Sequence, residues 1–153
     1  MPPKFGIAAW RLDAFPQLAE AAGRLQGVLR HSAATAAVGV NALFYGLPGT
    51  GKTELARALA EASGLRAYQV RSADEDGDGL RRTGRLSAYL LAQRLLGRWR
   101  DAVLIFDEVE DVFDPGDEPF AFMGVRRPTG RQKGWMNRIL EDNPVPAIWS
   151  TND

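Results

Sequence analysis

A glycine-rich run in the first third of the chain has the residue types and spacing of a phosphate-binding loop. Residues 46–53 fit the pattern G-x-x-x-x-G-K-[ST] in full, between an apolar run and a helical one. Gly49 and Gly51 allow backbone conformations that a Cβ would block, so successive N–H groups can point at phosphate oxygens. Lys52 brings a positive charge to the β- and γ-phosphates, and the Thr53 hydroxyl can ligate Mg²⁺. The predicted binding residues are Gly46, Pro48, Gly49, Thr50, Gly51, Lys52, Thr53 and Glu54.

Two carboxylates follow the most apolar run of the sequence, at 102–106. Phosphoryl transfer depends mostly on positioning and charge neutralisation, so Asp107 would hold Mg²⁺ and Glu108 would orient and deprotonate the attacking water. An apolar strand followed by Asp-Glu also occurs as a solvated strand end, and the phosphate loop favours the catalytic interpretation. The acidic residues that come next are interpreted as a solvated helix face and turn: Glu110, Asp111 and Asp114.

Short apolar runs alternate with amphipathic runs along the chain. The pattern predicts strands at 41–45, 65–70, 102–106 and 147–150, and helices at 17–30, 53–63, 86–99 and 131–141. Loops are expected at 72–84 and 114–130. On the third helix, four leucines are expected to face inward: Leu90, Leu91, Leu95 and Leu96.

Strands that alternate with helices imply an α/β fold with a parallel sheet, right-handed crossovers and helices on both faces. Ligands of such sheets bind at the carboxyl ends of the strands. We therefore expect the chemistry to lie just after Tyr45, Phe106 and Ser150.

The composition excludes several classes of protein. The chain has 153 residues and no cysteine, which excludes disulfide scaffolds, thiolate metal sites and cysteine nucleophiles. The longest strongly apolar run has five residues, at 102–106, whereas a membrane helix needs about 20. The N-terminus lacks the features of an export signal, so a cytoplasmic protein is expected. The 19 Lys and Arg residues balance 19 Asp and Glu residues, which argues against dominant phosphate-backbone binding.

Three stretches together resemble the ATPase core of the AAA+ family. The loop reads Gly-Leu-Pro-Gly-Thr-Gly-Lys-Thr at 46–53, and Phe106-Asp107-Glu108 matches the second acidic motif with its glutamate. Trp149-Ser150-Thr151-Asn152 is similar to the strand called sensor 1. The resemblance implies a P-loop NTPase fold with three αβα layers and a parallel sheet. It divides the chain into an N-terminal lead-in and linker helix at 1–40 and a partial ATPase core at 41–153.

The resemblance also implies roles for residues and partners. Asn152 would contact the γ-phosphate and the attacking water, and it would emerge between Lys52 and Glu108. The first, fourth and third strands would lie side by side, with the second strand outside the third. The implied activity is hydrolysis of Mg-ATP to ADP and phosphate, which drives conformational remodelling of a macromolecular partner, in a ring of identical subunits in the complete protein.

Two departures from the family pattern shape these expectations. The chain stops at Asp153, whereas the family continues with a fifth strand, an arginine finger and a helical lid carrying sensor 2. We therefore expect a truncated domain that lacks the fifth strand and the lid, with an apolar sheet edge at 42–45 and a tendency to aggregate. The segment at 72–84 has no aromatic residue where substrate-threading members place a pore loop, so threading is not supported.

Other readings of the motifs stay open at this point. A nucleotide-binding switch or assembly module would bind ATP with little turnover, since it would lack the arginine finger. A nucleic-acid-remodelling ATPase would differ only in its partner. Two basic segments could touch nucleic acid or a neighbouring subunit, or be surface charge: Arg81, Arg82, Arg85, Arg94, Arg98 and Arg100, and Arg126, Arg127, Arg131, Lys133 and Arg138. The acidic run at 74–79 begins like a calcium loop but has Arg85 where the bidentate Glu is needed.

Overall fold

The computed structural model describes residues 11–70, 82–113 and 130–152 of the chain. Two short 3₁₀ turns, η1 and η2, precede a series of helices and strands. The elements are η1 (Leu12–Ala14), η2 (Pro16–Leu18), α1 (Ala19–Thr35), β1 (Asn41–Tyr45), α2 (Lys52–Ala62), β2 (Arg66–Gln69), α3 (Arg82–Leu96), β3 (Ala102–Phe106), α4 (Glu110–Phe113), α5 (Gly130–Glu141) and β4 (Ala147–Thr151). The acidic run at 74–79, the arginines at 81, 126 and 127, Asp114, and most of the two expected loops lie outside the described residues.

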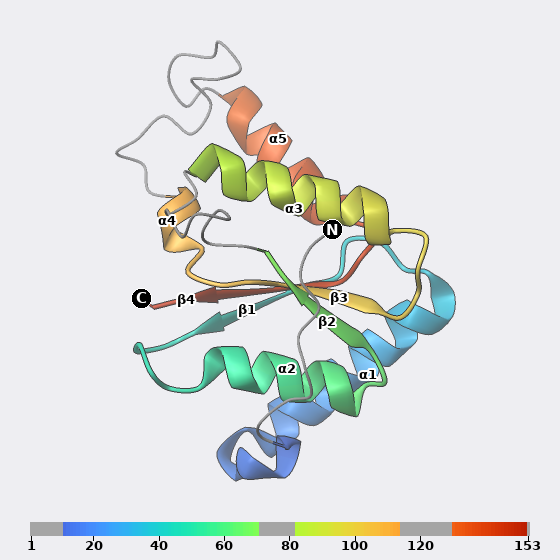
Figure 1. Ribbon diagram of the computed structural model, residues 1–153, viewed down its shortest axis with the longest axis vertical. Coiled ribbons are helices and arrows are strands. Elements are labelled where there is room, and N and C mark those ends of the chain that lie inside the picture. Colours follow the sequence, from blue (N-terminus) through green and yellow to red (C-terminus); the bar gives the residue numbers. More distant parts are fainter. Residues whose placement is uncertain (1–10, 71–81, 114–129, 153) are drawn as a thin grey trace, which may run out of the picture.

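The described strands form one parallel sheet in the order β1-β4-β3-β2. Helices α3 and α5 cover one face, and α1 and α2 cover the other, which makes three layers (Figure 1). This arrangement confirms the predicted fold class and the predicted strand order. Because all pairs are parallel, the carboxyl ends of the strands meet at one edge of the sheet, beside the start of α2.

The sheet separates two hydrophobic cores, and β3 contributes to both. Leu104 and Phe106 pack with α3 and α5, whereas Val103 and Ile105 pack with α1 and α2. All five β3 residues are at most 2% exposed, as the unbroken apolar run predicted. The strand that carries the acidic pair is therefore the most firmly buried element of the sheet.

The inward face of α3 differs from the prediction. Leu96 is buried as expected, but Leu90, Leu91 and Leu95 are 37–55% exposed. The buried stripe instead consists of Arg85, Leu86, Tyr89, Ala92, Gln93 and Leu96. Its two polar members, Arg85 and Gln93, interrupt the apolar period in the sequence. Both form hydrogen bonds with backbone groups inside the protein, which offsets the cost of burying them.

A polar network fastens the amino ends of β1 and β4. The Asn41 side chain accepts a hydrogen bond from Trp149 Nε1 at 3.0 Å and donates one to the Leu140 carbonyl at 2.6 Å. The Asn143 amide donates to the carbonyls of Val40 and Val145. These bonds fix the register of the strand pair, so the opposite ends of the strands present their residues in alignment.

At the outer edge of the sheet, β1 exposes Leu43 and Tyr45, which are 58% and 78% exposed.

The first helix runs from Ala19 to Thr35, five residues beyond the predicted end, and stops where Ala36 adopts a left-handed conformation. No helix in the described part of the chain is long and apolar enough to cross a membrane.

Two glycines provide a matched test of this backbone. Gly39 has φ +73°, and a Cβ there would lie 2.6 Å from the Glu141 carbonyl oxygen, whereas a Cβ on Gly27 in α1 would meet nothing within 4 Å. We expect Gly39→Ala to lower the free energy of unfolding by about 1–3 kcal/mol. Gly27→Ala should raise it by about 0.5–1 kcal/mol. Urea denaturation measures both, and equal effects of the two substitutions would contradict the described turn before β1.

Candidate nucleotide-binding site

The glycine-rich loop connects β1 to α2, and its glycines have positive φ angles. Gly49 has φ +76° and Gly51 has φ +84°, a region that residues with a Cβ rarely adopt. Helix α2 begins immediately afterwards, and its first intrahelical bond runs from Leu55 N–H to the Gly51 carbonyl at 2.8 Å. The N–H groups at the start of α2 and the positive end of its dipole are therefore available to an anion.

Two side chains of the loop fold onto its own carbonyls. The Lys52 ammonium donates to the carbonyls of Gly46 at 2.7 Å and Leu47 at 2.9 Å. The Thr50 hydroxyl donates to the Leu47 carbonyl at 2.9 Å. Lys52 is thus held at the mouth of the loop, where a positive charge can reach bound phosphate.

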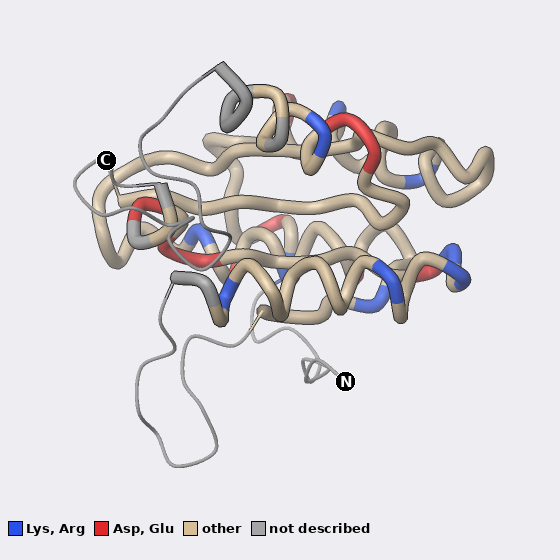
Figure 2. The backbone as a smooth tube through the Cα atoms, turned by 90° about the horizontal axis from the view of Figure 1, so that it is seen from above, with Lys and Arg blue, Asp and Glu red and all other residues tan. Residues whose placement is uncertain are grey.

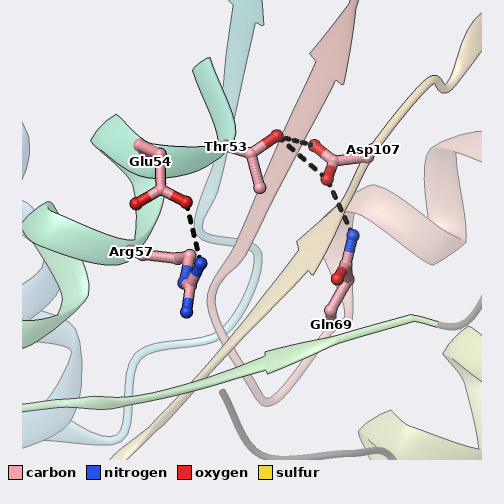
Figure 3. Close-up of polar contacts among 5 residues, drawn as sticks. All are labelled: Thr53, Glu54, Arg57, Gln69 and Asp107. Atoms are coloured by element: carbon pink, nitrogen blue, oxygen red, sulfur yellow. Dashed lines mark hydrogen bonds and ion pairs between the residues drawn. The ribbon is translucent and has the colours of Figure 1, made fainter. Parts of the chain in front are cut away.

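The Asp107 carboxylate is the meeting point of three elements. It accepts hydrogen bonds from the Thr53 hydroxyl, 3.0 Å from each carboxylate oxygen, and from Gln69 Nε2 at 2.8 Å (Figure 3). Ser150 Oγ donates to it at 2.7 Å. Thr53 comes from α2, Gln69 from the end of β2 and Ser150 from β4. Gln69 was missed in the sequence, although its place at the carboxyl end of a strand beside β3 was a signal that could have found it.

Glu108 lies just past the strand, in a left-handed conformation with φ +54°. Such a conformation is uncommon for a residue with a side chain and raises the energy of the backbone. The next residue, Val109, is buried and donates its N–H to the Ser150 carbonyl at 2.9 Å. The turn therefore leaves Glu108 exposed while its neighbours on either side are fixed.

A cavity of about 340 Å³ gathers most of the predicted site residues. It is lined by Pro48, Gly49, Thr50, Gly51, Lys52, Thr53, Glu54, Asp107, Glu108, Ser150 and Asn152. Gly46 is absent from this lining and contributes to a neighbouring groove instead. Glu54 lines the cavity while it forms an ion pair with Arg57 at 2.7 Å (Figure 3).

The neighbouring groove is larger and mostly apolar, with a volume of about 620 Å³. Phe15, Leu25 and Leu43 are among its lining residues. It shares Thr50, Gly51 and Lys52 with the cavity of about 340 Å³, so the groove and the cavity meet at the glycine-rich loop.

The oxygen atoms around Asp107 fit a magnesium ion. A carboxylate and a hydroxyl, 3.0 Å apart at the wall of the cavity, are hard oxygen donors of the kind that Mg²⁺ prefers. Among the described residues, no three acidic or histidine side chains gather into a metal-binding group. Magnesium typically uses one or two carboxylates together with water and substrate phosphates, and the donors present here match that pattern.

Glu110 differs from its prediction as a solvated residue. It is half-buried at the start of α4, and its Oε1 accepts a hydrogen bond from the Asn152 backbone N–H at 3.2 Å. Burial alone would raise the pKa of Glu110. The hydrogen bonds that its carboxylate accepts from its own backbone N–H, from Thr151 and from Asn152 together lower that pKa. Glu110 thereby fastens the segment that presents Asn152 to the cavity.

The basic segments give no single charged face in the described residues. Figure 2 shows basic and acidic positions interspersed along the elements. Arg94, Arg98 and Arg100 are exposed, but Arg85 is 3% exposed and donates to backbone carbonyls, so its assignment to a surface segment was wrong.

Comparisons with known proteins identify a family and a shared fold. The family model described as "ATPase family associated with various cellular activities (AAA)" matches residues 42–132, which are 91 of the 153 residues. No curated protein matches the chain. Among solved structures, PCH-2 of C. elegans superposes with a TM-score of 0.53 at 18% sequence identity. The match covers 88% of this chain and 37% of the PCH-2 chain, and at this identity it shows a shared fold.

The lowered pKa of Glu110 predicts a pH-dependent contribution to stability. A carboxyl group whose pKa is depressed on folding stabilises the native state above its unfolded value, near 4.5, and loses that contribution as the pH falls through the folded pKa. We expect Glu110→Gln to be less stable than the parent at neutral pH, with the difference shrinking on acidification. Thermal denaturation between pH 7 and pH 3 measures it, with the exposed Glu141→Gln as control. A constant difference across this range would contradict the role of the carboxylate.

Proposed function

The chain belongs to the AAA family of ATPases, and from that premise we propose that its cavity binds Mg-ATP and hydrolyses it to drive remodelling of a macromolecular partner. The observation that carries the proposal is the convergence of Lys52, Asp107, Glu108 and Asn152 on one cavity at the carboxyl edge of the sheet. They come from three separate segments of the chain: the start of α2, the turn after β3 and the end of β4.

The glycine-rich loop and the first turn of α2 bind the phosphates. The positive φ angles of Gly49 and Gly51 allow backbone N–H groups to turn toward a bound phosphate, and the helix dipole favours negative charge there. Lys52 exchanges its loop carbonyl partners for phosphate oxygens, which are better acceptors because they are charged.

Thr53 and Asp107 hold the magnesium ion, which neutralises charge on the phosphates when bound. Gln69 and Ser150 keep the Asp107 carboxylate in place, since each donates to it within 2.8 Å. The orientation of this carboxylate is thus fixed by the protein before any ligand arrives.

Glu108 acts on the attacking water and Asn152 on the γ-phosphate. Glu108 lines the cavity from the end of β3, and Asn152 lines it from the end of the adjacent β4. A carboxylate placed there can orient water and accept its proton, while a neutral amide can donate to a phosphate oxygen without competing for the metal.

The adenine base binds in the apolar groove beside the cavity. It joins the phosphate cavity at Thr50, Gly51 and Lys52. Phe15 lines it, and its ring lies 3.4 Å from the position that a Cβ on Gly51 would occupy. An aromatic ring beside the loop offers a flat surface against which a base can pack.

One observation favours a second candidate, a nucleotide-binding module with little turnover. Lys52 is the only positively charged residue among the described residues that line the phosphate cavity. An additional arginine in phosphoryl-transfer sites accelerates hydrolysis by about 10³–10⁵. Efficient turnover would then need an arginine from outside the described cavity, and a second copy of the chain in a ring is one source.

Two substitutions test the assignment of roles. We expect Lys52→Ala to weaken ATP binding on the order of 10- to 100-fold, since a charge-assisted hydrogen bond contributes about 1.5–3 kcal/mol. Glu108→Gln should keep the affinity and lower turnover by about 10²–10⁴. Calorimetric titration and phosphate release measure these effects, with Arg94→Ala and Glu141→Gln as exposed controls. Unchanged ATP affinity in Lys52→Ala would remove the phosphate-loop assignment.

The dependence of turnover on protein concentration separates the two candidates. If a second copy completes the site, phosphate released per molecule rises with concentration until assembly saturates. If the chain is a module with little turnover, the rate per molecule stays flat and close to that of Glu108→Gln at every concentration. Phosphate-release assays over a hundredfold range of concentration, with sedimentation of the same samples, distinguish these outcomes.

A further inference from the structure

Arg85 is a buried cation directly behind the acidic pair. It lies in the first turns of α3, on the face that packs against the sheet, and is 3% exposed. Burying a guanidinium is unfavourable unless hydrogen bonds inside the protein replace those that it makes with water. The groups that Arg85 binds therefore indicate its role in the structure.

Two of the groups that Arg85 binds are the backbone carbonyls of the acidic pair. Nη1 donates to the Glu108 carbonyl at 3.1 Å, and Nη2 donates to the Asp107 carbonyl through a short hydrogen bond. The guanidinium also lies over the Phe106 ring, 4.5 Å from its centroid. One side chain therefore contacts three consecutive residues at the end of β3. A planar fork can reach two carbonyls at once, which a lysine ammonium on a flexible stem does less well.

The residue held in this way has a strained backbone. Glu108 has φ +54°, and non-glycine residues keep such a conformation only where the surroundings over-determine it. On the far side of the turn, Val109 donates to the Ser150 carbonyl at 2.9 Å. Arg85 is the contact on the near side, and it binds the carbonyls that both precede and follow the strained torsion.

We propose that Arg85 is a positioning residue that holds Glu108 in its left-handed conformation and so sets the place of the carboxylate in the nucleotide cavity. The proposal that this placement serves hydrolysis rests on the proposed function. The mechanical part, that Arg85 maintains the strained turn, depends only on the contacts described above. Helix α3 is thereby connected to the acidic pair through one side chain.

A stability cycle tests the mechanical part without any ATPase assay. Glycine tolerates positive φ and alanine does not, so Glu108→Gly compared with Glu108→Ala reports the strain at this position. We expect glycine to raise the urea midpoint relative to alanine in the parent. In the Arg85→Lys background, the difference in urea midpoint between glycine and alanine at position 108 should shrink. The turn can relax there, because the two hydrogen bonds of the guanidinium are lost. Equal advantages in both backgrounds would overturn the proposal.

Ala36 provides the matched control. It also has a positive φ, +53°, but it ends α1, which covers the opposite face of the sheet from α3 (Figure 1). Ala36→Gly should change the urea midpoint by the same amount with and without Arg85→Lys. If the glycine advantage at Ala36 shrinks as much as that at Glu108, the effect reflects general loosening of the fold and the proposal fails.

Turnover tests the functional part. Arg85→Lys and the uncharged Arg85→Met should keep ATP affinity within about threefold of the parent while kcat falls by roughly 10²-fold, since misplacement of a catalytic group by about 1 Å has this effect. Equal losses of affinity and kcat would contradict positioning. A parent chain that binds ATP without turnover at any concentration would contradict the proposed hydrolysis, and the stability cycle would still decide the role of Arg85.

Discussion

The Asp107 carboxylate is the interaction on which the rest of the site depends. It stands at the end of the central strand and accepts hydrogen bonds from Thr53, Gln69 and Ser150, which belong to three other elements. Three donors at 2.7–3.0 Å fix one carboxylate only if the ends of β2, β3 and β4 and the start of α2 are aligned. The hydrogen bonds to Asp107 therefore form only when the strands of the sheet are in the correct register.

Contacts at the other end of the sheet, where the strands begin, hold the strands in this register. Asn41 and Asn143 join the amino ends of β1 and β4 through side-chain hydrogen bonds, and apolar side chains cover β3 on both faces. Because these contacts hold the strands elsewhere, the carboxyl ends of the strands can be followed by short polar turns. The turn after β3 carries the strain at Glu108, which a well-packed frame can sustain because its anchors, Arg85 and Val109, are both buried.

The sequence was sufficient for features that depend on local pattern. The structure agrees with the prediction of a glycine-rich loop between a strand and a helix and of a buried strand before Asp107 and Glu108. It also agrees with the strand order implied by the family resemblance. It was insufficient where polar side chains are buried. Arg85 and Gln93 interrupt the apolar stripe of α3, so exposed leucines were taken for the inward face. Gln69 and Glu110 carry no motif, and their partners Asp107 and Asn152 lie about 40 residues away in the sequence.

The most direct test of the account is to locate a bound nucleotide on the folded chain. Amide chemical shifts of the labelled protein can be followed while a non-hydrolysable ATP analogue and Mg²⁺ are added. The largest changes should occur at the amides of 49–53 and at Asp107, Glu108 and Asn152, which line the cavity from separate elements. Saturation of the protein with the analogue without changes at these amides, or with changes confined to another face, would contradict a single nucleotide site built around Asp107.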